Sequence, residues 1–170
     1  MKLNFGCGND KLDGYVNCDI SNNVNPDMIV DITKPLPFAD NEVEEVLMFH
    51  VLEHTLKPIE VLKEIYRVCK NGAVIKIRVP YFSSESAFSQ IDHYHFFSYT
   101  TFDCLDERHV CHWQGVGNFR TVYKRLKWRR QFFLLEWFFN LTPTMTRIYQ
   151  ELFCWLLPAK ELEIELIVLK

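Results

Sequence analysis

The chain has 170 residues, of which 48% are hydrophobic and 24% charged; this is the composition of one globular domain and excludes a disordered chain. The net charge of -3 gives no general attraction to nucleic acid, and no apolar run reaches the roughly 20 residues that span a bilayer. The six cysteines lack the spacing of a disulfide scaffold and Met1 leads into no apolar signal segment, so we expect a cytoplasmic protein with reduced thiols.

Short strands separated by turns are predicted for the first third of the chain. Apolar stretches occur at Lys2–Phe5, Tyr15–Ile20 and Met28–Ile32. A fourth stretch, Glu45–His50, is nearly continuous in apolar residues, which is typical of a strand covered on both faces by helices.

The segment Pro58–Lys70 predicts an amphipathic helix, because its apolar residues fall at helical spacing on one side. Proline suits its first turn, and Gly72 suits a left-handed cap after its end. Ala73–Val79 then alternates between apolar and polar residues, as a strand does. Strands alternating with helices indicate a parallel sheet.

The last third predicts a strand at Phe119–Trp128, two aromatic-rich helices in Gln131–Leu157 that break at Pro143, and a closing strand at Leu162–Leu169. We therefore expect one α/β domain over residues 1–170, with a mostly parallel Rossmann-like sheet, helices on both faces and one antiparallel pairing near its end. Residues 131–158 would be a helical insertion or lid before the last strand.

Two glycines and two acids stand where predicted strands end. Gly6 and Gly8 follow the first strand, where glycine lets a ligand approach the backbone. Asp19 and Asp31 end the second and third strands. A dinucleotide motif would require a third glycine where Lys11 stands, so hydride chemistry is disfavoured.

The two acids have two interpretations. A carboxylate at Asp19 can accept hydrogen bonds from both hydroxyls of a ribose. Asp31 can accept a hydrogen bond from an adenine amino group while Ile20 and Ile32 flank the ring. Alternatively, both acids only cap turns. Their position beside the glycines favours the ligand interpretation.

Several ordered motifs carry a family resemblance. KLNFGCGN resembles the glycine motif of class I S-adenosylmethionine-dependent methyltransferases in their short bacterial and archaeal form, and VNCDI resembles their ribose-binding segment. DITKPLPFADNEVEEVLMFHVLEH resembles their adenine loop and fourth strand, and VLKEIYRVCKNGAVIKIRVP the helix and strand that follow. The resemblance implies S-adenosylmethionine as cofactor, bound by Asn4, Phe5, Gly6, Cys7, Gly8, Asp19, Ile20, Asp31, Ile32, Phe49 and His50.

Two departures from this family pattern matter. Asn4 stands where the family often has an acid, which would weaken one contact to the methionine amino group. The chain also begins at its first strand, without the N-terminal helices that usually cover the substrate. We therefore expect another segment, either Gln131–Leu157 or the loop His93–Asp103, to close over the site.

All six histidines lie between the fourth and sixth predicted strands. The resemblance places His50 near the methyl end of the cofactor, with His54 and His95 in neighbouring segments. A neutral imidazole there can take a proton from an acceptor, so these three are the catalytic candidates. Because methyl transfer depends mainly on alignment, a packing role is the alternative for each.

The spacing His50-x-x-Glu53-His54 also permits a metal site. With His in place of a first Glu, it resembles the metal site of some small-RNA and quinone-pathway O-methyltransferases, and Cys104, Cys111 and His112 would add ligands for zinc. The spacing is irregular and contains no recognised zinc motif. We therefore predict that no metal is bound.

A basic run on the sixth strand precedes the aromatic segment. Arg125, Lys127 and Arg129 share one face of this strand, opposite Val122, Leu126 and Trp128. The aromatic segment can be a lid, an anionic-membrane surface or a homodimer interface, and we favour the lid.

The predicted function is methyl transfer to a small acceptor, for example a sugar-, lipid- or nucleotide-linked metabolite. The alternative from another class is a non-catalytic S-adenosylmethionine-binding module that recruits a partner through its aromatic tail. No nucleic-acid partner is expected.

Overall fold

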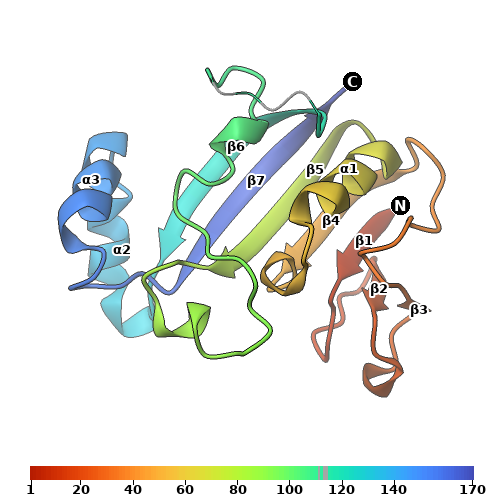
Figure 1. The fold of residues 1–170 in the computed structure, drawn as a ribbon, viewed down its shortest axis with the longest axis horizontal. Helices are drawn as coiled ribbons and strands as arrows, with labels where there is room; N and C mark the ends of the chain where they lie inside the picture. Colours follow the sequence, from red (N-terminus) through yellow and green to blue (C-terminus); the bar gives the residue numbers. More distant parts are fainter. Residues whose placement is uncertain (111, 113–114) are drawn as a thin grey trace.

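The computed structural model describes residues 1–110, 112 and 115–170, and within these the strands form one seven-stranded sheet of order β3-β2-β1-β4-β5-β7-β6 (Figure 1). β1 to β5 are parallel, whereas β7 runs antiparallel to both neighbours. The strands are β1 Lys2–Phe5, β2 Val16–Asp19, β3 Met28–Ile29, β4 Val43–Phe49, β5 Cys69–Pro80, β6 Asn118–Lys127 and β7 Glu161–Leu169. The predicted α/β sheet is confirmed.

Three helices and several short turns complete the described chain. The α-helices are α1 Pro58–Val68, α2 Phe133–Phe139 and α3 Pro143–Ile148, and a π-turn covers Tyr149–Phe153. The 3-10 turns are Asn22–Val24, Leu52–His54, Glu85–Ala87, Asp103–Leu105 and Arg130–Phe132. No helix in this part of the chain is long and apolar enough to cross a bilayer.

The predicted helix and cap differ in detail from the structure. α1 ends at Val68, and β5 begins at the next residue. Gly72 does adopt the left-handed region, with φ of 82°, but it turns the chain inside β5 and caps no helix. The predicted break at Pro143 is confirmed, since Pro143 opens α3 and the Thr142 hydroxyl accepts from the Met145 N–H.

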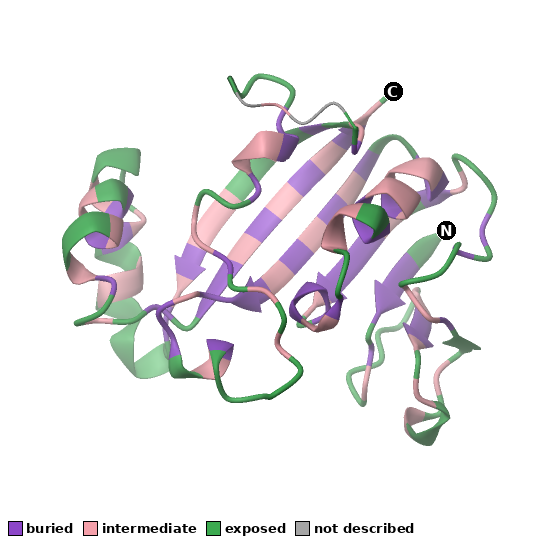
Figure 2. Ribbon diagram, viewed as in Figure 1, coloured by how far each residue is buried: buried purple, intermediate pink, exposed green. Residues whose placement is uncertain are grey.

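One face of the sheet carries α1, which buries Val61, Leu62, Ile65 and Val68 against the central strands (Figure 1). These strands show the alternation of buried and half-buried residues that a one-sided core produces (Figure 2). The core is therefore concentrated between α1 and strands β1, β4, β5 and β7.

The opposite face is polar where helices were expected. Lys76 pairs with Glu45 at 2.9 Å, and Arg78 pairs with Glu163 at 2.6 Å, across neighbouring strands. No helix covers these pairs in the described residues, so the expectation of helices on both faces holds for one face only. The alternation of Lys76 and Arg78 with apolar residues in β5 is typical of a strand whose second face is exposed to solvent.

The aromatic segment is an insertion beside β6, at the end of the sheet opposite β1 to β3 (Figure 1). Glu136 of α2 accepts from Lys127 of β6 at 2.7 Å. The Asn140 side chain donates to the Leu126 carbonyl at 2.8 Å and accepts from the Leu126 N–H at 2.9 Å. A register shift near Val122 leaves that residue exposed, contrary to its predicted place on the buried face of β6.

Candidate functional site

The turn after β1 brings the chain close to the end of β4. Gly6 has φ of 63° and Gly8 has φ of 48°, in the left-handed region that glycine adopts without strain. A Cβ on Gly6 would lie 2.5 Å from Cγ2 of Val51. Gly6 is thus required by packing as well as by its dihedral angle.

Asp19, at the end of β2, holds this turn in place. Its Oδ2 accepts from the Gly8 N–H and its Oδ1 from the Ser21 N–H, both at 2.9 Å. Each carboxylate oxygen has two lone pairs, so both retain capacity for a ligand.

Asp31 caps the next turn. Its Oδ1 accepts from the Thr33 N–H at 3.0 Å, and its Oδ2 lies 3.1 Å from the Lys34 ammonium. The hydrogen bonds from the Thr33 side chain and backbone, together with Lys34, hold the pKa of Asp31 below its usual value. Both acids therefore cap turns, and this does not exclude a ligand role because both also line a cavity.

The cavity has a volume of about 380 Å³ and opens along the carboxyl edge of β1, β2 and β4. Seven of the predicted cofactor residues line it: Phe5, Gly6, Asp19, Ile20, Asp31, Ile32 and His50. The remaining lining residues are Val30, Thr33, Val51, His54, Thr55 and Asp92. Ile20 is 67% exposed at this cavity, and such an apolar side chain is placed to cover a flat ring.

Four predicted cofactor residues do not line the cavity. Asn4 is buried, and its amide donates to Asn17 Oδ1 at 3.0 Å and to the Asp10 carbonyl at 3.1 Å, which fixes the loop after β1. The Phe49 ring lies under the Arg78 guanidinium. Cys7 and Gly8 belong to the turn after β1, and the Gly8 N–H donates a hydrogen bond to the Asp19 carboxylate.

His50 is held at the cavity by its backbone and by two carboxylates beside its ring. It has φ of 57°, uncommon for a residue with a side chain, and its N–H donates to the Arg78 carbonyl at 2.8 Å. Its Nε2 lies 3.6 Å from Glu161 and its Nδ1 3.2 Å from Glu53. Hydrogen bonds to Glu161 and Glu53 raise the pKa of His50 to about 9.

This charge state bears on the predicted catalytic role of His50. An imidazolium has no free lone pair, so at neutral pH His50 cannot accept a proton from an acceptor. Burial alone would raise the pKa of Glu161, but the hydrogen bonds from His50 and Lys160 lower it to about 2. His50 is therefore better suited to donate hydrogen bonds than to act as a base.

His54 lies one turn further along, beside a loop that crosses the edge of the sheet. Its Nδ1 is 3.1 Å from Asp92 Oδ2, and its ring meets the His93 ring edge to face at 4.7 Å. The loop is fixed where the Tyr94 N–H donates to the Glu53 carbonyl at 2.8 Å. From this loop Asp92 lines the cavity, whereas no residue of either predicted cover, 93–103 or 131–157, is among the lining residues.

His95, the third catalytic candidate, does not line the cavity. Its Nε2 is buried without a hydrogen bond, and its ring lies 6.4 Å from the Phe97 ring. The structure therefore brings together His50 and His54 but not His95.

Glu53, His54 and His93 place one possible ligand atom each within 4.8 Å of one another, and Glu53 Oε2 is buried without a partner. Against a metal, the His50 imidazolium already binds the carboxylate that would be a ligand, and it would repel a divalent cation. Of the additional ligands considered, Cys111 lies outside the described residues. The absence of metal stays a prediction.

Comparison with known families matches the description "Methyltransferase domain" over residues 3–77, the part of the chain that holds the turn, both acids and His54. This match covers 75 of the 170 residues, and over it the chain is similar to the methyltransferase-domain family. S-adenosylmethionine is the cofactor of this family. No protein of curated function matches the sequence.

Solved class I methyltransferases share the fold over nearly the whole chain. A methyltransferase from Archaeoglobus fulgidus has a TM-score of 0.67 at 15% identity, over 98% of this chain and 85% of that one. A methyltransferase from Methanosarcina mazei has a TM-score of 0.57 at 15% identity, over 99% and 92%. The [4+2]-cyclase SpnF has a TM-score of 0.61 at 13% identity, over 99% and 75%, so the fold alone does not define the reaction.

The cavity fits the cofactor of the matched family in chemistry. It offers carboxylates for hydroxyl and amino groups at Asp19 and Asp31, and apolar side chains for a ring at Ile20 and Ile32. Its volume is within the range of small-molecule sites.

Proposed function

We propose that this protein transfers the methyl group of S-adenosylmethionine to an oxygen, nitrogen or carbon atom of a small-molecule acceptor. The observation that carries the proposal is the shared cavity. It joins the left-handed turn at Gly6, the acids Asp19 and Asp31, and the histidines His50 and His54.

In this proposal each lining residue contacts a different part of the cofactor. Asp19 accepts the ribose hydroxyls, Asp31 accepts the adenine amino group, and Ile20 and Ile32 flank the adenine. Asn4 and Phe49 contribute indirectly, through the hydrogen bonds and the ring contact described above. The methyl-bearing end then lies toward His50, where β4 ends.

The cofactor supplies an activated methyl group on a sulfonium, so the protein's main task is alignment. His54 is the residue placed to take a proton from the acceptor, because it lines the cavity and Asp92 lies 3.1 Å from its Nδ1. Asp92 lies close to Nδ1 without a hydrogen bond to it, and its negative charge favours a proton on Nδ1, which would leave Nε2 as the accepting atom. His50 is held charged by Glu161 and Glu53, and both of its ring nitrogens face these carboxylates, so in this proposal it shapes the cavity wall and takes no proton.

An acceptor screen tests the proposal. The protein is incubated with S-adenosylmethionine and sugar-, nucleotide- and lipid-linked compounds, and S-adenosylhomocysteine is measured by mass spectrometry. We expect turnover with at least one class, and a loss of about 100-fold or more in kcat for His54→Gln, with cofactor affinity little changed. Firm cofactor binding without turnover across the screen would identify a binding module instead.

A further inference from the structure

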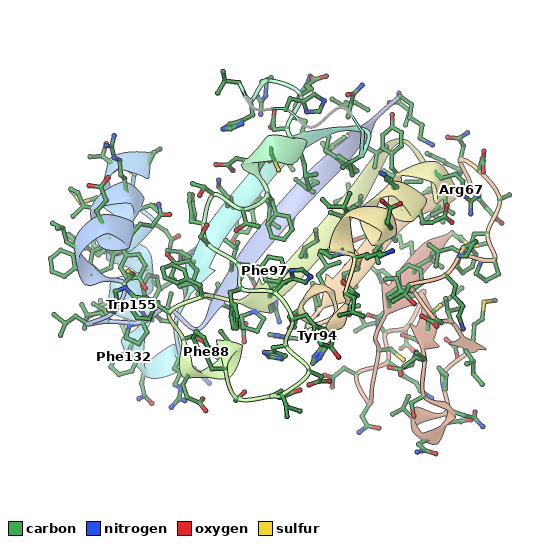
Figure 3. All side chains as sticks on the ribbon, in the orientation of Figure 1. Arg67, Phe88, Tyr94, Phe97, Phe132 and Trp155 are labelled. Carbon is green, nitrogen blue, oxygen red and sulfur yellow. The ribbon has the colours of Figure 1, made fainter. Side chains whose placement is uncertain are left out.

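The aromatic insertion leaves a large apolar surface uncovered. Phe133, Leu134 and Trp137 of α2, with Leu152, Trp155 and Leu156 near the π-turn, are each between 59% and 74% exposed; we call these six residues the aromatic end. Figure 2 shows α2 and α3 largely exposed, and in Figure 3 Trp155 lies at the end of the molecule opposite Arg67. Exposed apolar side chains in such number on one segment indicate an interaction site.

The aromatic end is held outward by a well-packed inner side. Trp128, Phe139 and Tyr149 are at most 6% exposed and contact one another's rings. The Trp128 indole N–H donates to the Leu157 carbonyl at 3.0 Å, and the Tyr149 hydroxyl accepts from the Ala159 N–H at 2.7 Å. The insertion therefore has a buried core of its own, and the exposed rings lie outside that core.

Two arginines without ion-pair partners border this surface. Arg129 and Arg130 are exposed and form no ion pair within the described residues. Of the other charges nearby, Glu136 pairs with Lys127 and Glu151 with Arg147, whereas Glu85, in a cavity that Arg129 also lines, forms no ion pair among the described residues. In a chain of net charge -3, this leaves a local excess of positive charge beside the apolar side chains.

Arginine and apolar groups meet in a cavity of about 280 Å³ at the base of the helices. Its apolar wall includes Phe132, Leu135 and Leu156. Its charged lining residues are Arg129, Lys160 and Glu85, and Lys160 is paired with Glu161. Arg130 lies beside Phe133 in the adjoining depression. An acyl chain with an anionic headgroup has the matching distribution of apolar surface and charge.

We propose that the aromatic end docks on an anionic lipid membrane, with its rings inserted at the interface and Arg129 and Arg130 against the headgroups. A second copy of the chain is the less suitable occupant. A twofold interface brings the same surface of both copies together, and it would crowd the unpaired arginines of both. Anionic headgroups neutralise them. The proposal is independent of the methyl-transfer reaction.

Vesicle flotation tests the proposal with the full chain. Phosphatidylcholine vesicles with and without phosphatidylglycerol are compared at physiological salt, and circular dichroism verifies folding of every variant. We expect co-flotation with the anionic vesicles that weakens as salt rises. Arg129→Gln/Arg130→Gln should lower the partition coefficient about 25-fold, since each basic residue near the surface contributes about fivefold. Trp137→Ala/Leu152→Ala should also lower it, about tenfold or more.

Lys57→Gln/Lys63→Gln on the α1 side removes the same charge away from the aromatic end and should leave flotation unchanged. Three results would overturn the proposal. One is absence of flotation by the folded wild type, another is equal binding by the arginine variant, and the third is a dimer that Trp137→Ala/Leu152→Ala dissociates without any vesicle binding.

Discussion

The substitution Asp19→Asn changes one charged acceptor at the cavity while preserving its size. In the wild type, both carboxylate oxygens accept backbone N–H groups, from Gly8 and Ser21, at 2.9 Å. An amide offers only one oxygen, so one N–H loses its acceptor. The variant should therefore be destabilised by about 1–3 kcal/mol, the usual cost of one unsatisfied group.

The larger effect should fall on the cofactor. Hydrogen bonds to a charged acceptor contribute about 1.5–3 kcal/mol each and neutral ones about 0.5–1.5 kcal/mol. Two ribose hydroxyls bound by Asp19 therefore lose about 2–3 kcal/mol together when the charge is removed. This predicts a Kd for S-adenosylmethionine that rises roughly 30- to 150-fold.

Isothermal titration calorimetry measures this Kd, and Asp27→Asn provides a matched control. Asp27 caps the same region, since its Oδ2 accepts from the Asn17 backbone N–H at 2.8 Å, but it does not line the cavity. Asp27→Asn should lower the melting temperature and change the Kd by less than about threefold. Wild-type affinity in a folded Asp19→Asn protein would refute the assignment of Asp19 to the ribose.

Three further predictions concern the same cavity. Asp31→Ala should raise the Kd less than Asp19→Asn does, by about 2- to 10-fold, because one contact to a neutral amino group is lost; an equal or larger loss in calorimetry would contradict this. The pKa of His50 is raised from 6.5 to about 9, so its stabilisation is complete below pH 6.5 and lost as pH rises through 9. Denaturant unfolding should show that His50→Asn, which tolerates a positive φ, costs less stability at high pH, and a cost independent of pH would count against it. Elemental analysis should find no stoichiometric metal, and one equivalent of a divalent ion lost on His93→Ala would overturn that prediction.

The glycine turn and the two acids that follow apolar runs were predictable because their signals are local. A left-handed glycine and an acid after an apolar run need only a few neighbouring residues to be recognised, and Gly6, Asp19 and Asp31 occupy one cavity as expected. α1 was equally clear from its apolar stripe. The two-residue length of β3 could not be predicted, because the end of this strand depends on its pairing with β2.

The remaining site features depend on contacts between distant segments. Asn4 and Phe49 lie in the motifs, yet their side chains contact Asn17 and Arg78 and do not reach the cavity. The charge of His50 depends on Glu161, more than 100 residues later in the sequence. Residues 131–157 do not line the cavity because the insertion attaches to β6, away from it, and the predicted loop 93–103 contributes no lining residue either. Apolar composition could not show which side of this insertion is buried: Phe139 and Tyr149 are, whereas Trp137 and Trp155 are exposed.

The most direct test of the account is a calorimetric titration of the wild-type protein with S-adenosylmethionine, S-adenosylhomocysteine and a nicotinamide dinucleotide. The cavity at Asp19 and Asp31 predicts one site per chain for each adenosyl ligand and no detectable heat with the dinucleotide. No binding of either adenosyl ligand, together with clear binding of the dinucleotide, would contradict the account.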